Sequence, residues 1–179
     1  MVRLTPEEAW EEIASAHTGI LTTLRRDGMP IALPVWFVAE DRTIAMMTPA
    51  RTKKIARVSR DPRASFMVES GQRWADLRGV HLAGRVEIVA DEAAAQRIEA
   101  AIFAKYAAFR PALDSLPAAT HAYYANQVVL RFVPEGGSSH GTTPASRNRD
   151  RQKVPDFDDD DVDPTESLTV TFPSWCVGA

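Results

Sequence analysis

The chain has 179 residues, only one cysteine, Cys176, and no long apolar run. A single cysteine cannot form an intrachain disulfide or a cysteine metal cluster, which excludes a disulfide-stapled domain and a zinc-finger fold. No stretch approaches the roughly 18 apolar residues of a membrane-spanning helix. The polar N-terminus, residues 1–8, is not typical of a signal peptide. We therefore expect a cytoplasmic protein with no structural metal and no membrane partner.

The sequence also has no recognisable hydrolytic or metal-binding constellation. None of the four histidines (His17, His81, His121 and His140) has a histidine four residues away or a cysteine nearby, so surface or strand positions suit them better than metal ligation. No nucleophile–base pair or carboxylate pair stands out, and we assign no catalytic residue. Redox chemistry remains open, because there the cofactor reacts while the protein binds and orients it.

Charge is divided unevenly along the chain. Residues 134–179 contain nine acidic and four basic side chains, which leaves 15 acidic and 17 basic ones in the rest of the sequence. A nearly neutral domain, with no aromatic residues interleaved among its cations, does not fit a nucleic-acid-binding protein. Residues 135–179 have hardly an apolar residue before Leu168. We therefore predict one folded domain at 1–134 and a flexible polar, acidic tail at 135–179.

Short segments rich in β-branched and aromatic residues dominate the predicted domain. Turn signals at Asp27-Gly28 and at 40–42 divide the first of them into a meander. Helices are predicted at the N-terminus, with Thr5 as N-cap and Pro6 in first position, and at 91–109. The pattern predicts a mainly β fold, a six-stranded antiparallel barrel with peripheral helices, whose strands lie at 19–24, 30–38, 43–48, 64–69, 82–89 and 126–133.

The most informative segment is basic and lies between two predicted strands. Ile55 and Val58 are three residues apart, the spacing of a short helix with one small buried face. The free N–H groups of its first turn and the cations near them would together hold a phosphate. The simpler alternative is a solvated basic surface helix. The segment holds six cations: Arg51, Lys53, Lys54, Arg57, Arg60 and Arg63.

The order of these segments resembles a known family across residues 5–134. The matching pieces are Ile20-Leu-Thr-Thr-Leu24, Asp27-Gly-x-Pro30, Val35-Trp-Phe37, Thr52-Lys-Lys54, Arg60-Asp-Pro-Arg63 and Leu82-Ala-Gly-Arg-Val-Glu-Ile88. In this order they resemble the FMN-binding split β-barrel family typified by pyridoxamine 5′-phosphate oxidase, and within it the actinobacterial branch that uses the deazaflavin coenzyme F-420. The resemblance implies a split barrel and a homodimer with two cofactor sites at the subunit interface.

The resemblance also implies a set of cofactor-binding residues. The phosphate grip falls on Thr52, Lys53 and Lys54, with Arg57 as a further contact and Arg51 as a helper. The ring-binding edge falls on two strands, mainly through backbone groups, at Pro34, Val35, Trp36, Met47 and Thr48. Trp74 would cover the cofactor or a neighbouring subunit, although simple packing is the commoner role of such an aromatic residue.

The identity of the cofactor depends on charge. Six cations suit the phosphodiester and polyglutamate tail of F-420 better than the single phosphate of FMN, which stays the alternative. The predicted function is an oxidoreductase that moves hydride to or from a small conjugated organic substrate, whose identity the sequence does not specify. A non-catalytic flavin, deazaflavin or haem carrier on the same barrel stays open as the other reading.

Overall fold

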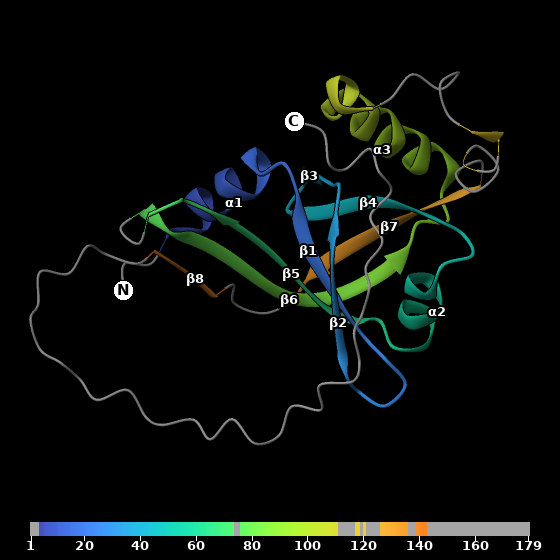
Figure 1. Cartoon of the computed structure of the whole chain (residues 1–179), viewed down its shortest axis with the longest axis horizontal. Coiled ribbons are helices and arrows are strands. Elements are labelled where there is room, and N and C mark those ends of the chain that lie inside the picture. The colour runs from blue at the N-terminus through green and yellow to red at the C-terminus, as the bar shows by residue number, and fades with distance from the viewer. Residues whose placement is uncertain are drawn as a thin grey trace, which may run out of the picture. The chain divides into compact units, whose positions relative to one another are not determined.

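An antiparallel β-sheet forms the body of the structure, a computed structural model that describes residues 4–73, 76–110, 117–118, 120, 126–135 and 139–142 (Figure 1). All of these residues belong to one compact unit, residues 1–146. In chain order the elements are α1 (Pro6–Ser15), β1 (Gly19–Leu24), β2 (Pro30–Val35), β3 (Val38–Glu40), β4 (Thr43–Pro49), α2 (Lys53–Arg60), β5 (Arg63–Ser70), β6 (Arg78–Ile88), α3 (Glu92–Lys105), the 3-10 turn η2 (Ala107–Phe109), β7 (Gln127–Pro134) and β8 (Ser139–Thr142).

The strands pair in the order β2-β1-β5-β6-β7-β4-β3, and β8 pairs with the first half of β6. β2 and β3 lie at opposite ends of this order, yet only Trp36 and Phe37 join them. Three consecutive Cα–Cα steps span at most about 11 Å. The two ends of the sheet must therefore approach each other, so the sheet curls into the expected split barrel.

Alternation of side chains builds the core inside this curl. Along β6, Val80, Leu82, Gly84 and Val86 are buried while the alternate residues His81, Ala83 and Arg85 face outward, as a sheet with one covered face requires. The interior cluster also includes Phe37, Phe66 and further side chains from β1, β4 and β7, together with Ile13 of α1 and Val58 of α2. A second cluster forms on the other face of β3, β4 and β7, where α3 packs.

The structure has more strands than the six predicted, for two reasons. Residues 30–38 form two strands, because the chain leaves the edge beside β1 at Val35 and joins β4 from Val38. The backbone N–H of Phe37 donates to the Tyr106 hydroxyl at 2.9 Å instead of to a neighbouring strand. β8 is an additional strand inside the predicted tail, and residues 143–179 lie outside the described ones, so the flexible tail at 135–179 stays a prediction.

The helix starts follow their sequence signals. Thr5 and Glu8 form a reciprocal capping box, with the Thr5 N–H donating to Glu8 Oε2 at 2.7 Å and the Glu8 N–H to Thr5 Oγ1 at 3.2 Å. Asp91 caps α3 through the Ala94 N–H at 2.6 Å. The predicted helix 91–109 ends earlier, at Lys105, and continues as the 3-10 turn. Within the described residues, no helix is long and apolar enough to cross a membrane.

Two glycines on β6 allow a direct test of how tightly the barrel closes. A Cβ at Gly84 would collide with the backbone carbonyl of Val133, whereas a Cβ at Gly79 would come no closer than 3.8 Å to Val68 O. We expect Gly84→Ala to cost about 1–3 kcal/mol of unfolding free energy, as overpacking does. Gly79→Ala should leave the denaturation midpoint close to that of the wild type. Equal midpoints for the two variants in chemical denaturation would contradict the close β6–β7 approach.

Candidate functional site

The start of α2 places two hydroxyl groups together. β4 leads into the helix through three residues, and Thr52 is its N-cap, accepting a long hydrogen bond of 3.5 Å from the Ile55 N–H. The Thr48 hydroxyl near the end of β4 lies 3.5 Å from that of Thr52, and Thr48 as a residue is 4% exposed. The helix N-terminus therefore combines free backbone donors with two side-chain hydroxyls, an arrangement that suits an anion.

Two cations on α2 have no anionic partner among the described residues. Lys54 and Arg57 are half-buried, and no ion pair includes either of them. The Nη1 atom of Arg57 is fully buried and makes no hydrogen bond within the described part of the chain. Buried polar groups are nearly always satisfied, and buried charges are normally paired. This atom therefore marks a position where a negatively charged ligand would complete the structure.

The electrostatics of Lys54 agree with this geometry. Burial lowers the pKa of the Lys54 ammonium group below its ordinary value, and the neighbouring Arg57 lowers it further. Both effects penalise the charged form in the unliganded protein. An anion placed between the two side chains would reverse both effects, because it replaces lost hydration and separates two like charges.

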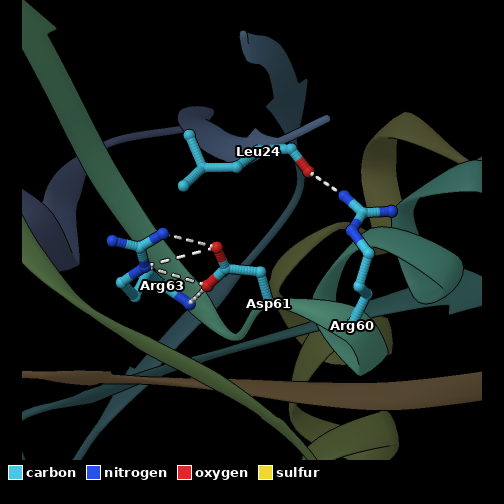
Figure 2. A network of polar contacts seen from close by, with 4 residues as sticks. All are labelled: Leu24, Arg60, Asp61 and Arg63. Carbon is cyan, nitrogen blue, oxygen red and sulfur yellow. Dashed lines mark hydrogen bonds and ion pairs between the residues drawn. The ribbon is translucent and has the colours of Figure 1, made fainter. Parts of the chain in front are cut away.

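The remaining cations of the segment divide into two exposed ones and two that have structural roles. Arg51 and Lys53 flank the N-cap and point into solvent. Arg60 donates from Nη2 to the Leu24 carbonyl at 2.6 Å, and Arg63 donates from Nε and Nη2 to the Asp61 carboxylate, as Figure 2 shows. Hydrogen bonds from Arg63 lower the Asp61 pKa to about 2. Within the part of the chain that the structure describes, only four of the six cations counted in the sequence are therefore free of such contacts.

The residues predicted for the ring-binding edge do not all lie on one face. Thr48 shares the inward face of β4 with Met46, whereas Met47 lies on the opposite face, in the α3 cluster. Trp36 is in that cluster too, stacked on Tyr106 with ring centroids 4.4 Å apart. Pro34 is exposed on β2, and its neighbour Val35 belongs to the interior core.

The structure thus gathers part of the predicted site around α2. Thr48, Thr52, Lys54 and Arg57 belong to β4 and α2 at this one end of the barrel, and Trp74 lies outside the described residues. The family resemblance assigns Thr48 through its backbone, so the contact of its hydroxyl with Thr52 was missed. The signal for that contact is the β4 alternation, in which Ile44 and Met46 point inward and Thr48 follows. No cluster of metal-ligating side chains occurs within the described residues.

Several solved structures share this fold. The conserved hypothetical protein Rv2991 from Mycobacterium tuberculosis is 28% identical, with a TM-score of 0.66, covering 78% of this chain and 86% of that chain. A FAD-binding protein from Mesorhizobium loti is 21% identical, with a TM-score of 0.61 and coverages of 78% and 96%. An F420 reductase is 22% identical, with a TM-score of 0.56 and coverages of 75% and 98%.

The family can be identified from the sequence match. No curated protein matches the chain. The family model described as pyridoxamine 5′-phosphate oxidase matches residues 5–141, which include every strand from β1 to β7 and the whole of α2. The expected split-barrel family is thereby confirmed, and the chain belongs to the pyridoxamine 5′-phosphate oxidase family.

Proposed function

We propose that this protein is an oxidoreductase that binds the deazaflavin coenzyme F-420, with FMN as the alternative cofactor, and moves hydride to or from a small conjugated organic molecule. The observation that carries the proposal is the pair of half-buried cations, Lys54 and Arg57, that have no described partner beside the N-terminus of α2. Both cofactors contain a phosphate group that would supply the missing anion.

The choice of F-420 rests on how the cations are distributed. Lys54 and Arg57 are set back toward the barrel, whereas Arg51 and Lys53 stand exposed at the N-cap. This arrangement suits a ligand with a phosphate held at the helix and additional negative charge continuing into solvent, as in the tail of F-420. Arg60 and Arg63 do not strengthen the argument, because their guanidinium groups already hold Leu24 and Asp61. The fold similarity to an F420 reductase agrees with this choice.

The cofactor would supply the hydride chemistry, and the protein would supply orientation. Fixing the phosphate at α2 would restrict the ring to the nearby end of β4, where the Thr48 hydroxyl lies 3.5 Å from that of Thr52. Restricting a reactant in this way lowers the entropic cost of reaching the reactive geometry. No side chain of this chain is assigned a proton-transfer role.

A carrier without turnover is the second candidate. A related fold occurs in a protein described only as FAD-binding, and neither the phosphate grip nor the barrel edge requires an acceptor site. The same cations would retain a flavin, a deazaflavin or a haem propionate without any reaction. The two candidates differ in one measurable property, the reduction of an acceptor.

We also propose a homodimer, for which the outer face of the sheet offers support. Across β2, β1, β5 and β6 the outward positions form two adjacent rows without a long charged side chain: Pro34, Ile20, Met67 and His81, then Ala32, Thr22, Ser65 and Ala83. A solvated antiparallel sheet face is usually polar, and Met67 is 38% exposed here. Glu69 borders the face at one end of β5 and Arg63 at the other. A two-fold axis perpendicular to the strands would bring these opposite charges together.

The first prediction concerns Lys54. The pKa of Lys54 in the folded protein lies below the ordinary value of 10.5. The charged side chain therefore destabilises the native state at neutral pH, and this destabilisation disappears as the pH rises from the folded pKa to the unfolded value of 10.5. We expect Lys54→Met to raise the melting temperature of the ligand-free protein at pH 7, with a gap to wild type that narrows toward pH 10.5. The same variant should lose F-420 and FMN affinity by about 1.5–3 kcal/mol, the usual value of a hydrogen bond to a charged group.

Lys53→Met is the matched control, because Lys53 is exposed on the same turn. It should not change the melting temperature, and its effect on affinity should be smaller and should vanish at high salt. A Lys54→Met variant that melts lower than wild type and binds both cofactors normally would remove the anion-site assignment.

The second prediction concerns chemistry. Purified from a host that makes both cofactors, the protein should copurify with F-420, identified by absorbance and mass. With reduced F-420 it should reduce an electron-poor conjugated acceptor faster than with reduced FMN. Faster turnover with FMN would reverse the cofactor choice. Tight binding of either cofactor without reduction across a broad acceptor panel would establish the carrier instead.

The third prediction concerns assembly. Sedimentation should give a dimer for the wild-type protein, and Met67→Glu should shift it to monomer, because a carboxylate would be buried in the apolar centre of the interface. Met29→Glu is the control, since Met29 is 58% exposed and lies in the β1–β2 turn, away from this face. If the wild-type protein is a monomer, or if both variants dissociate alike, this face of the sheet is not the dimer interface.

A further inference from the structure

The helix that carries the candidate anion site is short and needs external anchors. α2 has eight residues, fewer than an isolated helix requires for stability in water. Its apolar attachment consists of the buried Val58 and the partly buried Ile55. Two apolar side chains hold the helix against the barrel but leave its tilt weakly defined. Polar contacts at its two ends must therefore fix its direction.

The first end is fixed by the threonine pair, and the second by an arginine. Arg60 is the last residue of α2, and its Nη2 donates to the backbone carbonyl of Leu24, the last residue of β1, at 2.6 Å (Figure 2). These residues are 36 positions apart in sequence. The contact is thus a tertiary link between the end of the helix and the end of a strand.

The contact between Arg60 and Leu24 forms where the hydrogen-bonded pairing of β1 with β5 has ended. β1 and β5 pair up to Thr23 and Ala64, so the next pair would be Leu24 with Arg63. The Arg63 N–H instead donates to Asp61 Oδ1 at 3.1 Å, while the Leu24 carbonyl accepts from Arg60. The Arg60-Asp61-Pro62-Arg63 sequence therefore ends the ladder early and uses the released carbonyl to attach the helix.

We infer that Arg60 is a positioning residue for the anion site, acting through the Leu24 carbonyl to set the direction of α2. The inference rests on the proposed function, because the site it positions is the one assigned to the cofactor phosphate. Arg57 lies one turn before Arg60, and Lys54 one turn before that. A change in the tilt of the helix therefore displaces these two cations relative to the Thr48 and Thr52 hydroxyls, which stay with β4 and the N-cap.

The test uses the full chain and two probes, inorganic phosphate and F-420. Arg60→Met removes the donor, and Arg60→Lys keeps the charge and can still donate to Leu24. Arg26→Met removes an exposed cation from the neighbouring β1–β2 turn and serves as the charge-matched control. Amide ¹H–¹⁵N spectra report the environment of residues 52–57 without any ligand, and titration gives the affinities.

We expect Arg60→Met to shift the amide signals of residues 52–57. It should also lower the affinity for both probes about fivefold, as substitutions that act from outside a binding site do. Arg60→Lys should recover most of the affinity, and Arg26→Met should change neither readout. The thermal midpoint of Arg60→Met should stay near that of wild type, since the contact is exposed to water.

Two outcomes would overturn the positioning role. One is an Arg60→Met spectrum that matches wild type over residues 52–57. The other is an equal loss of affinity in Arg26→Met, which would mean that only net charge matters. If the wild-type protein binds neither probe, the proposed function fails by itself, and the ligand-free spectra still decide whether Arg60 sets the helix.

Discussion

The two-residue connection between β2 and β3 constrains the whole barrel. Because Trp36 and Phe37 join strands at opposite ends of the pairing order, the sheet has to curl on itself. The bend leaves the Phe37 backbone without strand partners, and Tyr106 replaces them. Its fully buried hydroxyl accepts from the Phe37 N–H at 2.9 Å and faces the carbonyls of His17 and Phe37 at 2.8 and 3.0 Å. One side chain from the end of α3 thus satisfies the corner on which closure depends.

Closure also determines where the candidate site can lie. β4 runs back from this corner between β3 and β7 and ends at Pro49, one residue after Thr48, so α2 starts shortly after the strand leaves the sheet. Local sequence makes Thr52 a helix N-cap, but only the curled sheet provides the buried position beside it. Lys54 and Arg57, which have no anionic partner in the described part of the chain, then represent a cost that the free protein bears. Stability given up at a defined place is typical of a site that a ligand completes.

Local signals in the sequence predicted those features that depend on neighbouring residues. The Thr5 N-cap, the turn at Gly28 and the α2 helix follow from residues within four positions of one another. The features that were missed depend on distant partners. The break after Val35 depends on Tyr106, 69 residues beyond Phe37, and the role of Arg60 depends on Leu24. The residue types predict a helix and a cationic segment, but they do not show which of the cations already donates to an acceptor within the protein.

That last distinction changes how charge should be weighed when a cofactor is inferred from sequence. A count treats Arg60 and Arg63 as equal to Lys54 and Arg57, although the first two already donate to protein acceptors and the second two face no described acceptor. Electrostatic attraction at a half-buried site is screened less than at the surface, so two half-buried cations there outweigh several exposed ones. Anchoring of a phosphate would therefore depend on Lys54 and Arg57. Arg51 and Lys53 would contribute mainly to attraction at longer range, which added salt removes first.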